Sequence, residues 1–91
     1  MPYTLLNEHK FKRICNQERF KEANQPRFDR LTRREMEIAS LVVQGYKSLQ
    51  IAEELFISRY TVEQHRKNVN RKLRVHSHSE LVQYALAFDL V

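Results

Sequence analysis

The 91-residue sequence has one cysteine, one glycine and two prolines, and it has no tryptophan. A single cysteine, Cys15, cannot form an internal disulfide, so the chain suits a reducing compartment. No apolar run approaches the roughly 20 residues that a membrane-spanning helix needs. The first residues lack a basic segment followed by an apolar stretch, which would indicate a secretory signal. We therefore expect a soluble, cytoplasmic protein without a membrane partner.

The motifs of common catalytic and metal sites are also missing. There is no glycine-rich phosphate loop, no HExxH pattern and no serine in a nucleophile elbow. His76 and His78 lie close together, but a closed zinc site needs four convergent ligands and the single cysteine is distant. We expect no enzyme activity, no cofactor, no metal and no small-molecule ligand.

What the chain has in excess is positive charge. Sixteen lysines and arginines against eleven acids give a net charge of +5. This balance favours an anionic partner, which could be nucleic acid, an acidic protein or an anionic membrane. The length suits one domain with a modest core, and the apolar residues recur at the 3.6-residue period of an all-α fold.

Residues 48–73 have the pattern of a helix-turn-helix. A short helix is followed by a corner at residues 56–58 and a longer helix over residues 59–73. Ser48 and Ser58 are the predicted N-caps, and Phe56 stands at a corner where many unrelated helix-turn-helix proteins have glycine. The apolar positions predicted to face inward are Leu49, Ile51, Ala52, Leu55, Ile57, Val62, Val69 and Leu73. In known examples the second helix enters the DNA major groove.

Two further helices are predicted around this unit. The first covers residues 32–44, with a capping box of Thr32 and Glu35 and with Gly45 just after its end. The last covers residues 79–90, with Ser77 as its N-cap and Glu80 completing a capping box. This last helix has two apolar stripes, and a small domain can bury one of them. The other stripe either covers the domain's own loops or forms a partner surface, and its members are Val82, Leu86 and Leu90.

The helix over residues 59–73 carries the residues with functional chemistry. Six basic residues between Arg59 and Arg74 accompany one acid, Glu63. An ordinary solvated helix face mixes its charges, so this bias favours DNA contact. Candidates for base contacts are Lys67 to guanine, Gln64 to adenine and Glu63 to cytosine. Candidates for phosphate contacts are Lys47, Ser48, Arg59, Thr61, Asn68, Arg71 and Lys72.

The sequence resembles the LuxR-type (GerE-type) DNA-binding domain from about Phe28 to the end. The resemblance rests on Leu31-Thr32-x-x-Glu35, Gly45, Ile51-Ala52-x-x-Leu55-x-Ile57-Ser58-x-x-Thr61-Val62-x-x-His65, Asn68-Val69 and Lys72-Leu73-x-Val75. It departs from the family's pattern at Arg74, where glycine is usual, and at His78, where arginine is usual.

The resemblance implies a four-helix domain of the winged-helix-like superfamily without a wing. It implies base contacts at Glu63, Gln64 and Lys67, and a homodimer formed through the last helix. Such domains are usually the output end of a bacterial transcription regulator bound to double-stranded DNA, with RNA polymerase as a further partner.

The predicted domain covers residues 28–91. Residues 1–27 are expected to be a linker from a longer protein, or else a dimerising or regulatory helix, with a break at residues 24–26 because of Pro26. Two other functions remain open. One is a promoter-binding domain like region 4 of sigma factors, and the other is a basic helical module that binds an acidic protein.

Overall fold

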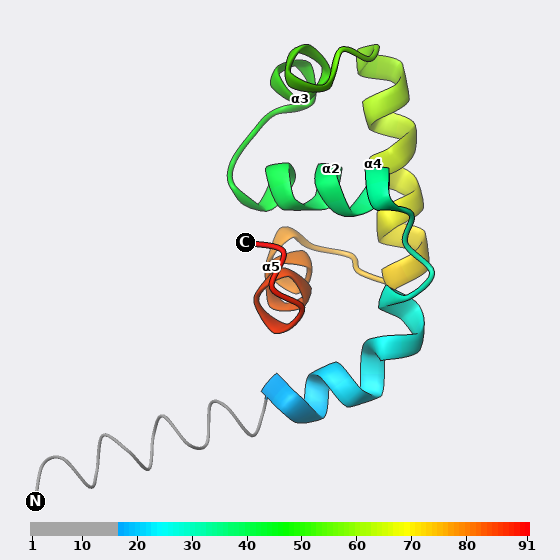
Figure 1. The fold of residues 1–91 in the computed structure, drawn as a ribbon, viewed down its shortest axis with the longest axis vertical. Helices are drawn as coiled ribbons and strands as arrows, with labels where there is room; N and C mark the ends of the chain where they lie inside the picture. The colour runs from blue at the N-terminus through cyan, green and yellow to red at the C-terminus, as the bar shows by residue number, and fades with distance from the viewer. Residues whose placement is uncertain (1–16) are drawn as a thin grey trace, which may run out of the picture.

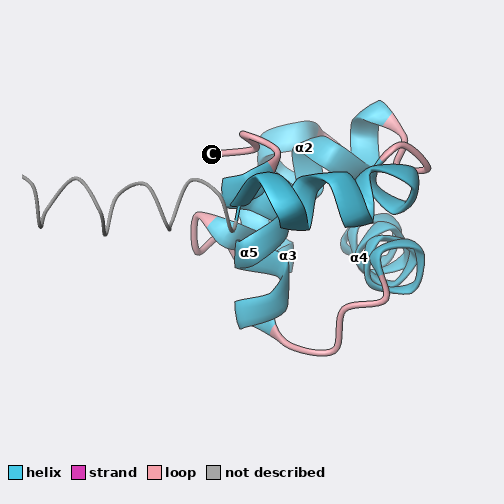
Figure 2. Cartoon of the chain, turned by 90° about the horizontal axis from the view of Figure 1, so that it is seen from below, coloured by secondary structure: helices cyan, strands magenta, loops and turns pink. Residues whose placement is uncertain are grey.

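The computed structural model describes residues 17–91, and all regular structure in that range is helical (Figure 2). Residues 17–28 form a first helix, which is followed by α2 (Arg33–Val43), α3 (Ser48–Leu55), α4 (Arg59–Leu73) and α5 (His78–Ala87). In Figure 1, α2 crosses α4, α3 lies at the beginning of α4, and α5 lies toward its end. The predicted all-α class is confirmed. None of the helices in residues 17–91 has the length and apolarity needed to cross a bilayer.

The core lies where α2 packs against α4 and α5, and where α3 packs against α4. Its buried apolar side chains are Leu31, Ile38, Ala39, Val42, Ile51, Ala52, Val62, Val69, Leu73, Val75, Leu81, Tyr84 and Ala85. Most of the positions predicted to face inward are therefore buried. Leu49 is not, because 56% of it is exposed. The buried positions of α3 begin at Ser48 and continue through Ile51 and Ala52, and Leu49 lies one residue off that stripe.

The N-cap residue is the predicted one in three of the four labelled helices. The Thr32 hydroxyl accepts from the Glu35 N–H at 3.1 Å, and the Glu35 carboxylate accepts from the Thr32 N–H at 2.8 Å, so the predicted capping box is confirmed. Ser58 caps α4 as predicted. The prediction for α3 was wrong by one residue: Lys47 is the N-cap and Ser48 is already inside the helix.

Each of the four labelled helices is followed by a residue with a positive φ. These residues are Gly45 (φ 98°), Phe56 (φ 56°), Arg74 (φ 56°) and Asp89 (φ 56°). In each case the next N–H donates back across the last turn, as from Tyr46 to the Leu41 carbonyl at 3.0 Å and from Val75 to the Asn70 carbonyl at 3.0 Å. This arrangement is the Schellman motif. Arg74, where the resembling family usually has glycine, thus adopts the backbone conformation that glycine would favour.

The last helix is shorter than predicted. It spans His78–Ala87, not residues 79–90, so Leu90 lies outside it. The Leu90 side chain packs against the core, and its carbonyl accepts from the Ser40 hydroxyl at 2.6 Å. Ser77 is the N-cap as predicted. The predicted capping box with Glu80 is only half formed, because the Glu80 carboxylate accepts from the His76 N–H at 2.9 Å and not from the Ser77 N–H.

The described part of the N-terminal segment is a helix, and the predicted break at residues 24–26 is absent. The ribbon instead changes direction between its blue and cyan parts in Figure 1, as expected where Pro26 removes a backbone donor. Phe20 meets the edge of Tyr84 with ring centroids 4.9 Å apart, and Phe28 stacks on Phe88 at 4.1 Å. Residues 17–28 therefore cover one side of α5, while residues 1–16 lie outside the described range.

Candidate nucleic-acid interface

One face of α4 carries polar side chains away from the core. Val62, Val69 and Leu73 are buried on its inner side. On the opposite side we define the recognition stripe as Tyr60, Gln64, Lys67 and Arg71, which follow one another at helical spacing. Tyr60 is 72% exposed, Lys67 and Arg71 are exposed, and Gln64 is half-buried. The stripe agrees with the direction predicted from the sequence.

Glu63 lies at the edge of the recognition stripe that faces α3. A hydrogen bond with Ser48 lowers the pKa of Glu63, partial burial opposes this, and the positive charges of Arg66, Arg59 and Lys67 lower it further. Ser48 also accepts a hydrogen bond from Arg66 Nη1 at 2.8 Å. The Glu63 carboxylate is thus ionised and lies where α3 meets α4.

The sequence did not predict the role of Arg66, which connects α4 to Ser48 at the beginning of α3. Its partner Ser48 is 18 residues away in the sequence, so no local pattern links the two. Ser48 itself is only 6% exposed. Its hydroxyl is therefore used within the protein, and the phosphate contact predicted for the free N–H groups at this helix beginning stays a prediction.

Among the other predicted phosphate contacts, Lys47, Arg59 and Arg71 are exposed. Lys47 and Arg59 line a shallow hollow at the beginnings of α3 and α4. Thr61 Oγ1 lies 2.8 Å from Ser58 Oγ, and Asn68 Oδ1 accepts from Arg71 Nη2 at 3.3 Å. Lys47 and Arg59 therefore lie near the beginning of the recognition stripe, and Arg71 belongs to the stripe itself.

Lys72 has a different environment from the one predicted. Its Nζ lies 2.6 Å from Glu35 Oε1, and the two side chains are 17% and 3% exposed. Burial alone would raise the pKa of Glu35, but hydrogen bonds from Lys72 and Thr32 and the Lys72 charge outweigh it and lower the pKa below 4.5. The Lys72 ammonium group joins α4 to the beginning of α2, so it is not a free cation for DNA.

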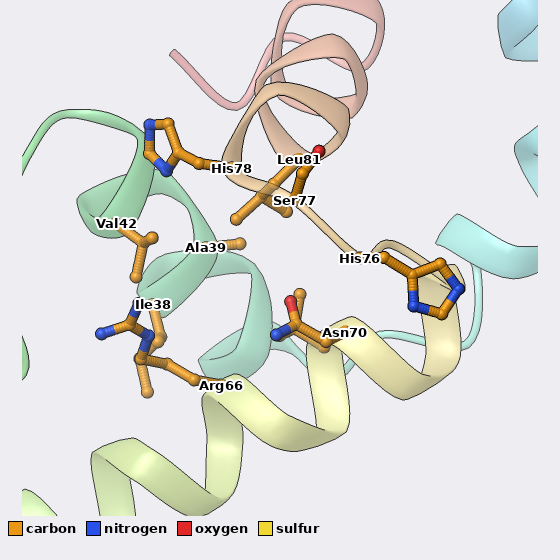
Figure 3. A pocket seen from close by; sticks show the side chains of 10 residues that line it. Ile38, Ala39, Val42, Arg66, Asn70, His76, Ser77, His78 and Leu81 are labelled. Carbon is orange, nitrogen blue, oxygen red and sulfur yellow. The ribbon is translucent and has the colours of Figure 1, made fainter.

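A small hollow lies between α2, α4 and the beginning of α5 (Figure 3). Its volume of about 200 Å³ is below the roughly 300 Å³ at which small-molecule pockets begin. The rings of His76 and His78 lie on opposite sides of the view. Within residues 17–91, no group of three or more histidine, cysteine or acidic side chains is placed to bind a metal ion. We assign no ligand to this hollow.

The predicted dimerisation residues have three different environments. Leu86 is 54% exposed and Val82 is half-buried, both on α5. Leu90 packs against the protein's own core and does not continue their stripe. The apolar surface left on α5 is therefore smaller than the sequence suggested.

Comparison with known proteins agrees with this geometry. The family model described as bacterial regulatory proteins, luxR family, matches residues 29–85. The chain is 48% identical to the oxygen regulatory protein NreC of Staphylococcus carnosus (strain TM300) over 61 residues, which are 67% of this chain and 28% of that protein. It is also 48% identical to the oxygen regulatory protein NreC of Staphylococcus aureus (strain JH9) over 64 residues, 70% of this chain and 30% of that protein.

The match thus spans less than a third of these curated relatives. It includes α2, α3, α4 and most of α5, which together hold the recognition stripe. The chain belongs to the luxR family of bacterial regulatory proteins, and residues 29–85 are its helix-turn-helix DNA-binding domain.

Proposed function

We propose that this chain is the DNA-binding output domain of a transcription regulator that places α4 in the major groove of a specific DNA site. The observation that carries the proposal is the recognition stripe, which combines polar and cationic side chains on the exposed side of α4. Such side chains have no role in the core, and the major groove is wide enough for an α-helix. The proposed place of action is the cytoplasm, where bacterial DNA lies.

Three residues are proposed to contact bases. Lys67 donates to guanine O6 or N7, and Gln64 forms a paired contact with adenine. Glu63 is ionised and can only accept, so its partner would be the N4 amino group of cytosine.

The proposed phosphate contacts come from side chains that are exposed or half-buried on and beside the recognition stripe. Lys47, Arg59 and Arg71 supply charge, while Thr61 and Asn68 supply neutral hydrogen bonds. The side chains of Ser48 and Lys72 are left out because Ser48 is buried and the Lys72 ammonium group is paired with the buried Glu35 carboxylate. A backbone N–H at the beginning of α3 remains suited to a phosphate.

The regulator is proposed to act as a homodimer through Val82 and Leu86 of α5. Half-exposed Leu86 supports this proposal because residues 17–91 leave 54% of its surface uncovered. Two copies would then present two α4 helices to half-sites about one helical turn apart. A regulator of transcription also has RNA polymerase as a proposed partner.

Selection of binding sites from random duplex DNA tests sequence-specific binding. We expect an enriched motif of two related half-sites. Lys67→Ala should cost about 1–3 kcal/mol on the selected site and relax the preference at one base pair. Arg71→Ala, the matched control on the same stripe, should weaken selected and random DNA alike. Recovery of no motif, or equal losses on both DNAs for Lys67→Ala, would contradict the proposal.

A further inference from the structure

His78 lies beside two of the cations that are proposed to contact phosphates. It is the first residue of α5, and it is exposed. It lines the shallow hollow at the beginnings of α3 and α4. We call this the basic hollow, and its ionic and histidine side chains are Lys47, Arg59, Glu63, Arg66 and His78. The packed fold thus adds a residue of α5 to a site otherwise formed by α4 and the N-cap of α3.

His76 and His78 are two residues apart but have different neighbours. In Figure 3, Val42 lies between His78 and Arg66, whereas His76 lies at the opposite side of the view. His78, Val42 and Arg66 all line the basic hollow, and His76 is not among the residues that line it. A change in the charge of His78 is therefore felt in the basic hollow, and His76 provides a comparison of the same chemistry outside it.

The charges in the basic hollow favour an anion. Lys47, Arg59 and Arg66 supply three positive charges. The Glu63 carboxylate, which is ionised, supplies one negative charge. A protonated His78 would add a fourth positive charge to this set. Because like charges repel and a phosphate attracts all four cations, a phosphate bound here favours the protonated imidazole.

Other groups near His78 do not supply the balancing charge. Glu80 lies two residues further along α5, and its carboxylate accepts from the His76 N–H at 2.9 Å. Val42 of α2 and Tyr46 of the next loop also line the basic hollow, and neither is acidic. The negative charge that stabilises a protonated His78 would therefore come from a bound anion.

We propose that His78 is a further phosphate-contacting residue, which donates a charge-assisted hydrogen bond to the DNA backbone when its imidazole is protonated. The proposal rests on the proposed function, because it adds a contact to the same complex of α4 with DNA. Lys47 and Arg59, two of the proposed phosphate contacts, line the same hollow. DNA binding would then take up a proton at His78. Since histidine changes charge between about pH 5 and about pH 8, DNA affinity should fall as the pH rises through this range.

The test titrates the full 91-residue chain with fluorescent duplexes at about pH 6 and about pH 8. One duplex carries the selected site and the other a random sequence, and the buffers contain no phosphate, so that only DNA supplies this anion. His78→Gln keeps the side chain neutral, and His78→Arg gives it a permanent positive charge. His76→Gln is the matched control outside the basic hollow. Urea unfolding of each variant at both pH values checks that the fold is retained.

We expect the wild type to bind both duplexes at least about fivefold more tightly at the lower pH, because a hydrogen bond from a charged donor is gained. The slope of log affinity against log salt concentration should also steepen by about one for each bound copy. His78→Gln should bind at the lower pH as the wild type does at the higher pH. His78→Arg should bind tightly at both pH values, and His76→Gln should behave like the wild type.

A wild-type affinity that is independent of pH, or a wild-type pH profile in His78→Gln, would overturn the proposal and leave the proposed function intact. The same holds if His78→Arg bound no more tightly than His78→Gln. A pH effect confined to the selected duplex would replace the phosphate contact with a base contact. A wild-type chain that binds neither duplex would overturn this proposal and the proposed function together.

Discussion

The backbone conformation at residue 45 explains why the single glycine of this sequence stands there. Gly45 has φ 98°, and a Cβ added there would meet no atom within 4 Å. The demand for glycine is therefore conformational, with no steric contribution from neighbours. Phe56, Arg74 and Asp89 meet the same demand without glycine, at the expense of backbone strain.

Gly45→Ala should consequently destabilise the domain by about 1 kcal/mol, although the mutation removes no contact. Arg74→Gly should do the reverse and stabilise it by roughly 0.5 kcal/mol, because relief of strain exceeds the added entropy of the unfolded chain. Urea unfolding measures both changes. Arg74→Ala separates the loss of the guanidinium group from the backbone effect, and a destabilised Arg74→Gly would show that this group contributes more than the strain.

Glu35 should make the stability of the fold depend on pH, because its pKa is lowered in the folded protein. A lowered carboxyl pKa contributes stability above the unfolded value, and this contribution disappears as the pH falls through the folded value. Glu35→Gln should cost about 2 kcal/mol at pH 7, less than a fully buried pair would, because Lys72 keeps some exposure.

The same variant should also flatten the loss of stability as the pH falls through 4.5, the ordinary glutamate pKa, and below it. Thermal unfolding across this range measures the effect, with Glu22→Gln on the exposed first helix as the control. A variant with the wild-type pH profile would show that the ion pair with Lys72 contributes little to folding.

Among the helices, the clearest departure from expectation is the first one. Residues 1–27 were predicted to be a linker or an additional helix, and the aromatic side chains of the helix over residues 17–28 pack on α5 and on Phe88 just after it. Lys21 also lies over the Phe88 ring, with its Nζ 5.9 Å from the ring centroid. The domain's packing thus begins before Phe28, where the family resemblance begins.

Removal of residues 1–28 should therefore destabilise the remaining four helices by about 2–4 kcal/mol, because Tyr84 and Phe88 lose their aromatic neighbours. Phe20→Ala in the full chain should give a smaller part of that loss. Urea unfolding of the two variants measures it. If the shortened chain were as stable as the full one, the first helix would contribute nothing to the domain.

The sequence predicted those features of the helices that depend on near neighbours. The bounds of α4, the capping box of Thr32 with Glu35, the cap at Ser58 and the turn at Gly45 all depend on residues within a few positions. The outward direction of the recognition stripe follows from the same periodicity.

The features that were missed depend on how helices cross. Glu35 and Lys72 are 37 residues apart, and Ser48 and Arg66 are 18 apart, so their pairing requires the packed fold. The same applies to Leu90, which turns back onto α2 after α5 ends early. Helical periodicity alone extended α5 through this turn and left Leu90 on an exposed stripe.

At the scale of the whole molecule, the salt dependence of DNA affinity should depend on how many copies of the chain bind the DNA, because each copy adds its own phosphate contacts. Three exposed cations per copy, Lys47, Arg59 and Arg71, are proposed to contact phosphates. For a dimer this gives a slope of about −5 in a plot of log affinity against log salt concentration. A single copy should give about −3.

Leu86→Glu would place a charge in the proposed dimer interface and should shift the slope toward the value for one copy. Analytical ultracentrifugation of the same samples, with and without DNA, reports assembly directly. Gln83→Glu, an exposed change of equal charge on α5, serves as the control. A slope that is near zero in the wild type would exclude the proposed phosphate contacts, and an unchanged slope in Leu86→Glu would place the dimer interface elsewhere.

One hydroxyl group connects the beginning of the described chain to the helix proposed to enter DNA. Tyr84 Oη lies 2.9 Å from Asn24 Oδ1 in the first helix and 3.1 Å from the carbonyl oxygen of Leu73, the last residue of α4. A twist applied to the first helix by preceding polypeptide would have to break this bridge or carry the end of α4 with it. Movement of the first helix would thus be passed to the end of the helix proposed to enter DNA. Tyr84→Phe, which removes only the hydroxyl oxygen and keeps the ring against Phe20, would weaken this connection.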